Sequence, residues 1–222
     1  LPVEFDARRG HNQVQVDRRM ERTFAKMLRS VVRQDVNVMM VGEIRDEETA
    51  DVAVGAARTG HLLLSTMHTN DSVGALITLQ HLGVQPFMIS NTVTIVIAQR
   101  LVRCLCPECK TEYQPEKPVL DAVGLCEDEA KDITFYRAKG CKECFEMGYK
   151  KRTGIYEVLE VTPKIKSLIL NNGDHDDLMR AAHNDGMKTL LESGLKKVRE
   201  GITSVDELLR VTYHAQSSAV SL

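Results

Sequence analysis

Hydrophobic residues recur at helical spacing over residues 19–33, with arginine and lysine residues on the opposite face. This spacing predicts an amphipathic helix. Two short apolar runs follow at 38–42 and 61–66, and a helix-forming stretch at 46–58 separates them. Because short connections join strand, helix, strand and helix, this order predicts a parallel sheet that is covered by helices.

The remaining pattern is mainly helical. It predicts helices at about 72–82, 87–103, 163–171, 175–184, 187–200 and 204–213, and a strand at 153–161. Pro163 falls in the first turn of one helix, and Ser204 with Glu207 has the spacing of a capping box. The polar stretch 110–140 predicts an insertion that is closed by a metal, rather than a layer of a sheet.

These patterns divide the chain into four parts. They are an α/β core at 1–103, a metal-binding subdomain at 104–150, a strand with a helical subdomain at 151–214, and a disordered tail at 215–222. The predicted fold class is therefore α/β, with a cysteine-rich insertion and a C-terminal helical subdomain.

Composition excludes some classes of function. The chain has 29 Lys and Arg residues against 31 Asp and Glu residues, only 5% of its residues are aromatic, and Trp is absent. Binding to nucleic acid irrespective of sequence needs a basic surface or aromatic stacking platforms, so no nucleic-acid partner is expected. The most apolar window, at 93–98, contains Thr94 and ends at Gln99 and Arg100, which predicts no membrane-spanning helix.

The first residues, Leu-Pro-Val-Glu-Phe, include no initiating Met and no export signal. We therefore expect a portion of a longer protein that is not exported and works in the cytoplasm. Thiols stay reduced in that compartment, so disulfide bonds are not expected among the six cysteines.

Four of these cysteines form two Cys-x-x-Cys pairs, Cys106 with Cys109 and Cys141 with Cys144, and 31 residues lie between the pairs. This spacing is typical of a structural zinc site with four thiolate ligands. Two redox-active dithiols are the alternative. Because four protein ligands complete a tetrahedral zinc ion, no catalysis is expected at the metal. Cys104, two residues before Cys106, is a plain thiol or a competing ligand, with the plain thiol favoured, and Cys126 has no assigned chemistry.

Polar residues end both predicted strands of the core. Glu43 follows the first strand, and His68 follows the second, after Ser65 and Thr66. Ligands bind at the carboxyl ends of parallel strands, so Glu43 and His68 predict half of an active site. A carboxylate there can polarise a water that attacks a γ-phosphate or help to hold Mg²⁺, and the hydroxyls can bond phosphate. The alternatives are that Glu43 only pairs with Arg45 and that His68 is a structural hydrogen-bonding residue.

Two further basic residues and a second histidine stand near this site in the sequence. Arg29 and Arg33 lie four residues apart on one helical face and can reach phosphates of a neighbouring subunit, although a solvated basic face is the commoner explanation. His61 begins the second strand, so its position alone favours a structural role. No Gly-x-x-x-x-Gly-Lys-[Ser/Thr] run occurs in the 222 residues, so this sequence lacks a phosphate-binding loop.

Together the motifs resemble the secretion ATPases, the hexameric motors of type II secretion and type IV pilus assembly. The resemblance runs from Pro2 to about Thr212. The segments that carry it are 12–16, 23–25, 28–29, 32–35, 40–46, 48–50, 59–61, 64–66, 68–71, 98–103 and 106–109. It implies a partial RecA-like sheet, of the P-loop NTPase type, in the core. The paired cysteines resemble the secretion and pilus-extension branches, whereas pilus-retraction motors generally lack them.

The resemblance also implies roles for residues. Positions 38–43 correspond to a Walker B segment and positions 60–68 to a His box. Pro2-Val3-Glu4 looks like the end of an Asp box, in which Leu1 stands where an Asp is usual. The implied catalytic residues are Glu43, His68, Arg29, Arg33 and Arg45, and the implied nucleotide-binding residues are Glu4, His61, Ser65 and Thr66.

By the same resemblance, the parent protein is a homohexameric motor that couples ATP hydrolysis to type II secretion or type IV pilus assembly. It uses ATP, Mg²⁺ and one structural Zn²⁺ per chain. Its partners are an inner-membrane platform protein and a cytoplasmic adaptor, so it lies at the cytoplasmic face of the inner membrane. Without a phosphate-binding loop, the 222 residues alone are expected to bind ATP poorly and to be inactive. The alternative function is a zinc-stapled partner-binding module with a vestigial nucleotide site.

Overall fold

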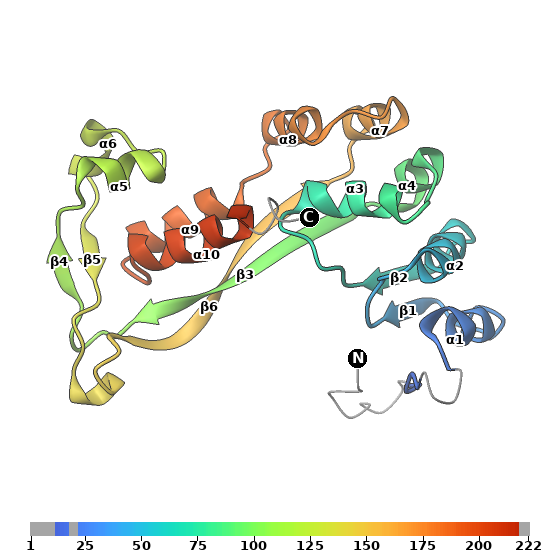
Figure 1. Ribbon diagram of the computed structural model, residues 1–222, viewed down its shortest axis with the longest axis horizontal. Helices are drawn as coiled ribbons and strands as arrows, with labels where there is room; N and C mark the ends of the chain where they lie inside the picture. Colours follow the sequence, from blue (N-terminus) through green and yellow to red (C-terminus); the bar gives the residue numbers. More distant parts are fainter. Residues whose placement is uncertain (1–11, 18–21, 218–222) are drawn as a thin grey trace. The chain divides into compact units, whose positions relative to one another are not determined.

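The structure is a computed structural model that describes residues 12–17 and 22–217 (Figure 1). Its helices are α1 (Phe24–Val31), α2 (Glu47–Arg58), α3 (Ser72–His81), α4 (Pro86–Thr92), α5 (Lys117–Ala122), α6 (Glu127–Lys131), α7 (Pro163–Leu170), α8 (His175–Asn184), α9 (Leu190–Arg199) and α10 (Val205–Ser217). Its strands are β1 (Val38–Val41), β2 (Leu62–Ser65), β3 (Ile95–Leu105), β4 (Thr111–Tyr113), β5 (Phe135–Arg137) and β6 (Tyr149–Glu160), and a 3₁₀ turn spans Lys142–Cys144.

The described residues fold into two compact units. Unit 1 contains the residues up to Thr69, Val73–Val96 and Glu160–Ala181. Unit 2 contains Asn70–Ser72, Ile97–Leu159 and the residues from Ala182 onward. The four-part division expected from composition remains a prediction.

A short parallel sheet forms the centre of unit 1. Strands β1 and β2 pair in parallel, with Val38 opposite Leu62 and Met40 opposite Leu64. Met39 is buried, whereas Met40 is 72% exposed, as the alternation of side chains along a strand requires. The parallel pair joined by α2 is the arrangement that the sequence predicted.

Local sequence explains where α2 begins. The side chain of Asp46 caps the helix by accepting a hydrogen bond from the N–H of Thr49 at 2.8 Å. Glu47 and Glu48 occupy the first turn, where the helix dipole favours acidic groups. Its small buried residues, among them Ala50 and Ala53, allow close packing, and α2 contacts α1, β2 and α4. The helix therefore starts immediately after the polar end of β1.

The predicted helix at 87–103 is wrong. The structure places the short helix α4 there, followed by the long strand β3, which pairs with β6. Residues 93–97 read Val-Thr-Ile-Val-Ile, and five consecutive β-branched side chains are restricted in a helix and fit a strand well. β6 contains residues 153–160 of the predicted strand at 153–161, and it begins four residues earlier, at Tyr149.

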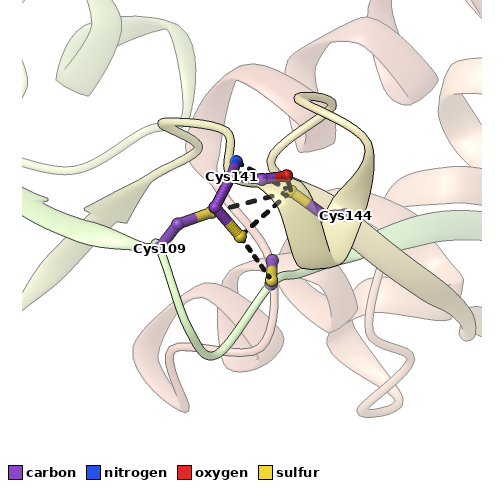
Figure 2. A group of neighbouring side chains, drawn as sticks. Cys109, Cys141 and Cys144 are labelled. Atoms are coloured by element: carbon purple, nitrogen blue, oxygen red, sulfur yellow. Dashed lines mark hydrogen bonds between the residues drawn. The ribbon is translucent and has the colours of Figure 1, made fainter.

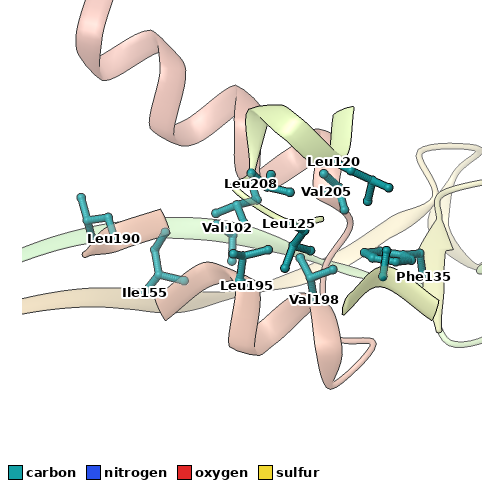
Figure 3. Close-up of a cluster of buried hydrophobic side chains, with 12 residues drawn as sticks. Val102, Leu120, Leu125, Phe135, Ile155, Leu190, Leu195, Val198, Val205 and Leu208 are labelled. Carbon is teal, nitrogen blue, oxygen red and sulfur yellow. The ribbon is translucent and has the colours of Figure 1, made fainter. Parts of the chain in front are cut away.

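The core of unit 2 is built around β3 and β6 (Figure 3). Ile155 and Val102 from these strands pack with Leu195 from α9, Leu208 from α10 and Phe135 from β5, and all five are buried. Within 110–140, β4 and β5 form a two-stranded antiparallel sheet, and α5 and α6 lie between them in the sequence. The sequence predicts an insertion rather than a layer of a larger sheet, and the structure adds a small two-stranded sheet within this stretch.

The sequence predicts the N-terminal residues of α7 and α10. Pro163 occupies the first turn of α7, as predicted. At α10, the hydroxyl of Ser204 accepts the N–H of Glu207 at 3.2 Å, which is one half of the predicted capping box. The side chain of Glu207 instead accepts hydrogen bonds from Arg103 and Arg210, so the reciprocal half is not formed.

Within the described residues, every helix is too short or too polar to cross a membrane.

Candidate functional site

The ends of β1 and β2 bring an acid, a guanidinium and an imidazole together. Nε of Arg45 lies 2.6 Å from Oε2 of Glu43. Nε2 of His68 lies 3.4 Å from the same oxygen and 3.3 Å from Nη2 of Arg45. The predicted juxtaposition of Glu43 and His68 is therefore present. The pairing of Glu43 with Arg45, which was the alternative interpretation, is present as well.

Hydrogen bonds between the two loops hold these residues in place. Pairing continues past the strands, because the N–H of Ile44 donates to the carbonyl of Thr66 at 3.0 Å. The hydroxyl of Ser65 donates to the carbonyl of Val41 at 3.0 Å, and that of Thr66 donates to the carbonyl of Gly42 at 2.6 Å. Both hydroxyls thus fix the loop geometry. Binding of phosphate by them would require these hydrogen bonds to be exchanged.

Burial within this group is uneven. The side chain of Glu43 is 6% exposed, whereas those of Arg45 and His68 are 53% and 75% exposed. The carboxylate of Glu43 is thus buried, and the guanidinium of Arg45 and the imidazole of His68 face solvent. Such a carboxylate can orient a water or bind a divalent cation, and the cationic and imidazole groups can approach an anionic ligand.

The other described residues of the predicted nucleotide site lie on or beside α1 and α2. Nη1 of Arg29 pairs with Oε1 of Glu48 at 2.7 Å, which joins α1 to α2 on the surface. Arg33 follows α1 and is exposed. Nδ1 of His61 lies 3.1 Å from the carbonyl oxygen of Ala56, at the end of α2, in a structural position. The predicted nucleotide contact of Glu4 lies outside the described residues.

The second candidate site is a cluster of four thiols, Cys106, Cys109, Cys141 and Cys144 (Figure 2). Their Sγ atoms all lie within 4.8 Å of one another. Three of the Sγ–Sγ distances are 4.0 Å for Cys106 and Cys141, 3.8 Å for Cys109 and Cys144, and 3.7 Å for Cys141 and Cys144. The two Cys-x-x-Cys pairs therefore converge on one point, as the sequence predicted.

These distances fit a tetrahedral metal site. Four sulfurs at about 2.3 Å from a zinc ion lie about 3.8 Å from each other. A disulfide bond would need a sulfur separation of about 2.05 Å, and all six cysteines are free. Sulfurs from both pairs mix within the cluster, and two independent dithiols would not produce this arrangement. The donor set and its geometry fit Zn²⁺.

Backbone hydrogen bonds favour the thiolate form of one ligand, Cys144. The N–H groups of Cys141 and Gly148 donate to Sγ of Cys144 at 3.2 Å and 3.1 Å. Burial acts to raise the pKa of Cys144, but these hydrogen bonds and those from the neighbouring thiols together outweigh it and lower that pKa to about 7. Burial raises the pKa of Cys141 to about 12. A bound cation would compensate the burial of the thiolates.

Two glycines in this site were missed by sequence reasoning. Gly148 donates to Cys144, and its carbonyl accepts the N–H of Cys106 at 2.9 Å, so it contacts both pairs. A Cβ at Gly148 would lie 2.5 Å from the Cβ of Ala138. Gly140 has φ +100°, and a Cβ there would lie 2.7 Å from the carbonyl oxygen of Glu146. The available signal was a glycine directly before the second pair and another four residues after its last cysteine.

Comparison with known proteins relates this chain to a family of secretion system proteins. The family model described as "Type II/IV secretion system protein" matches residues 2–210. The type II secretion system protein E of Pseudomonas aeruginosa is 45% identical over 211 residues, which are 95% of this chain and 41% of that protein. The type IV pilus assembly ATPase PilB of Acinetobacter baylyi is 46% identical over 213 residues, which are 95% of this chain and 36% of that protein.

Solved structures support the fold. The pilus retraction motor PilT with bound ADP matches with a TM-score of 0.58 at 23% identity, over 85% of this chain and 43% of that one. The ATPase DotB of Legionella pneumophila matches with a TM-score of 0.56 at 22% identity, over 84% and 41%. The α/β fold class is thereby confirmed, and the chain spans about two fifths of the length of these curated relatives. The family match over nearly the whole chain, together with relatives above 40% identity, shows that this chain belongs to the type II/IV secretion system protein family.

Proposed function

We propose that this chain is the C-terminal portion of a hexameric motor ATPase that couples ATP hydrolysis to type II secretion or type IV pilus assembly. The observation that carries the proposal is the group formed by Glu43, Arg45 and His68 at the carboxyl ends of two parallel strands. Nucleotides bind at this edge in open α/β sheets. The names of the relatives at 45% and 46% identity point in the same direction.

In this proposal each residue of the group has a distinct task. Glu43 orients the water that attacks the γ-phosphate of ATP, and its buried position excludes competing solvent. Mg²⁺, when bound with ATP, supplies charge neutralisation on the phosphates. Arg45 and His68 lie at the solvent side of Glu43, where they would contact the phosphate oxygens of ATP. Arg29 and Arg33 are assigned to a neighbouring subunit's nucleotide, which needs Arg29 to leave its pair with Glu48.

The remaining parts of the proposal rest on the family resemblance. The motor is a homohexamer that works at the cytoplasmic face of the inner membrane, with a platform protein and a cytoplasmic adaptor as partners. The 222 residues contain no Walker A run, so the chain by itself is expected to bind ATP poorly and not to hydrolyse it. Turnover by these 222 residues at the rate of the full-length protein would contradict this part.

The test of the proposal is the variant Glu43→Gln in the full-length protein. Gln is a poor base and cannot bind Mg²⁺ as a carboxylate does, so kcat is expected to fall about 100-fold while ATP still binds. The measurement is steady-state phosphate release, with nucleotide binding followed separately. The matched control is Asp51→Asn, because Asp51 is an exposed acid on the neighbouring helix α2. An unchanged kcat in Glu43→Gln would overturn the assignment.

A second candidate function is a partner-binding module that is stapled by zinc and has a vestigial nucleotide site. One observation favours it: Phe145 and Met147, beside the cysteine cluster, are 84% and 62% exposed. Contact surfaces are marked by contiguous exposed apolar patches, and these two side chains would contribute to one. The two functions are separated by the sequence that encodes residues before Leu1. A Gly-x-x-x-x-Gly-Lys-[Ser/Thr] run there supports the motor, and a full domain without it supports the binding module.

A further inference from the structure

Helix α1 packs its first side chain against the glycine that precedes Glu43. Phe24 begins α1, and its side chain is half-buried. A Cβ at Gly42 would lie 3.3 Å from both Cε1 and Cζ of Phe24, which is closer than an ordinary van der Waals contact. The edge of the ring therefore occupies the space that a side chain at position 42 would take. Phe24, Gly42 and Glu43 all belong to unit 1.

The backbone conformation at position 42 does not itself require glycine. Among the described residues, the glycines with positive φ do not include Gly42. A residue with a side chain can therefore adopt the backbone conformation of Gly42. Glycine also serves where another group must approach the backbone closely. The ring of Phe24 is such a group, so this contact explains why position 42 has no side chain.

Hydrogen bonds join the same stretch of backbone to the end of β2. The carbonyl of Gly42 accepts the hydroxyl of Thr66 at 2.6 Å, and the N–H of Ile44 donates to the carbonyl of Thr66 at 3.0 Å. Glu43 lies between these two bonded residues in the chain, and its side chain is 6% exposed. The backbone that carries Glu43 is thus bonded to β2 and packed against α1.

A second contact joins α1 to the residues after Glu43. Nη1 of Arg29 lies 2.7 Å from Oε1 of Glu48, in the first turn of α2. Helix α1 therefore contacts the segment 42–48 at both of its ends. The two charged side chains are 52% and 56% exposed, so water and salt compete with their pairing and the pair stabilises little. Packing of the ring is not weakened in this way, and we expect it to be the stronger of the two contacts.

We propose that Phe24 is a positioning residue for Glu43. Its ring sets the path of the backbone at Gly42 and thereby places the carboxylate of Glu43 beside Arg45 and His68. The inference rests on the proposed function of that group. Phe24 acts through Gly42 and touches no reacting atom. A misplacement on the order of 1 Å can lower the rate of an enzyme about 100-fold, so the loss of the ring is expected to appear in kcat.

The kinetic test uses the full-length protein and exchanges the sizes of the two side chains. Phe24→Ala is expected to lower kcat for ATP hydrolysis about 10-fold with KM for ATP unchanged, because the ring contacts no nucleotide. Gly42→Val is expected to lower kcat as well, because its methyl groups meet the ring. In the double variant the valine fills the space that the ring leaves, and kcat is expected to recover to within about 3-fold of the parent. General destabilisation by either change would not produce this recovery.

Met27→Ala is the matched control. Met27 is a half-buried apolar residue on the same helix, and the ring of Phe24 rather than Met27 lies against Gly42. The effects of Met27→Ala and Gly42→Val on kcat are therefore expected to add. An unchanged kcat in Phe24→Ala, or losses that simply add in its double variant with Gly42→Val, would overturn the inference. If Phe24→Ala does not fold, Phe24→Leu and Gly42→Ala form the same cycle with smaller changes, and additive losses there overturn it equally.

Hydrogen exchange of this chain separates the inference from the proposed function. In Phe24→Ala, the amides of residues 42–45 are expected to exchange at least about 10-fold faster than in the parent chain. Those of α4 and α7, which belong to the same unit, are expected to be unchanged. Equal exchange of residues 42–45 in variant and parent would contradict the positioning role. If they exchange faster but the full-length parent shows no ATPase activity, the proposed function fails and the packing role of Phe24 stands.

Discussion

We expect the cysteine cluster to bind one Zn²⁺ per chain, and removal of that ion is expected to loosen the segment 104–150 more than β1 and β2. The four sulfurs from Cys106 to Cys144 already lie at the separation that a tetrahedral zinc site requires. Binding of zinc to four thiolates is local folding energy, on the order of 10 kcal/mol in small zinc domains. Without the metal, no bond holds the four sulfurs together, and the turn that contains Phe145 and Glu146 at positive φ loses its support.

Elemental analysis of reduced protein measures the zinc content. Hydrogen exchange before and after chelation measures the local stability of 104–150. Cys106→Ser is expected to lose the metal and to reproduce the exchange pattern of the chelated protein. Cys126→Ser is the matched control, because that cysteine is exposed and lies outside the cluster. Reduced, undamaged protein without metal would end the zinc assignment. Uniform loosening of the whole chain on chelation would show that the metal does not act locally.

Replacement of Glu207 by Gln is expected to lower the free energy of unfolding of unit 2 by about 3 kcal/mol. The carboxylate accepts the N–H of Arg103 at 3.0 Å and its guanidinium at 2.6 Å, and it also accepts the guanidinium of Arg210 at 2.7 Å. Gln has one acceptor oxygen and no charge for these donors. The cost stays moderate because the two arginines are 42% and 50% exposed and water can solvate them.

The effect of Glu207 depends on pH in a defined direction. Burial acts to raise its pKa, but hydrogen bonds from Arg210 and Arg103 together lower the pKa of Glu207 from 4.5 to about 2. A group whose pKa is lower in the folded state stabilises the fold above its unfolded pKa, and that stabilisation is lost as pH falls toward the folded pKa. The difference between parent and Glu207→Gln is therefore expected to be full near pH 7 and to shrink between about pH 5 and pH 2.

Chemical denaturation at several pH values measures this difference. Glu200→Gln is the control, because Glu200 pairs with Lys197 at 3.2 Å on the surface, and surface pairs of this kind contribute about 0–1 kcal/mol. A pH-independent difference between parent and Glu207→Gln would contradict the role assigned to the charge. A destabilisation as small as that of the control would contradict the magnitude.

Short-range patterns predicted much of this fold. The two parallel strands, the helix between them and the convergence of the cysteine pairs follow from residues that are close in sequence. A Cys-x-x-Cys pair supplies two ligands from one turn. Only the convergence of the two turns depends on the rest of the fold. The helical interpretation of 87–103 failed because Pro86 opens a real helix, and the β-branched run after Thr92 was counted as its continuation.

Two buried carboxylates of unit 2, Glu157 and Glu207, could not be predicted in the same way. Glu157 accepts hydrogen bonds from Ser72, which is 85 residues away, and Glu207 accepts from Arg103, which is 104 residues away. Along the sequence, Glu157 alternates with apolar neighbours as any exposed strand residue does. Glu207 lies at a capping-box position and was assigned a local partner. Burial of both depends on contacts that local spacing does not record.

Side chains along β6 alternate between the core and the solvent, and this strand begins beside the cysteine cluster. Ile155, Glu157 and Leu159 point inward, and Tyr156 and Val158 point outward at 47% and 48% exposure. A slip of one residue between β3 and β6 would exchange these two sets and turn the carboxylate of Glu157 to water. β3 ends directly before Cys106, and β6 starts directly after Gly148, whose carbonyl accepts the N–H of Cys106. The thiol cluster therefore ties the end of β3 to the start of β6.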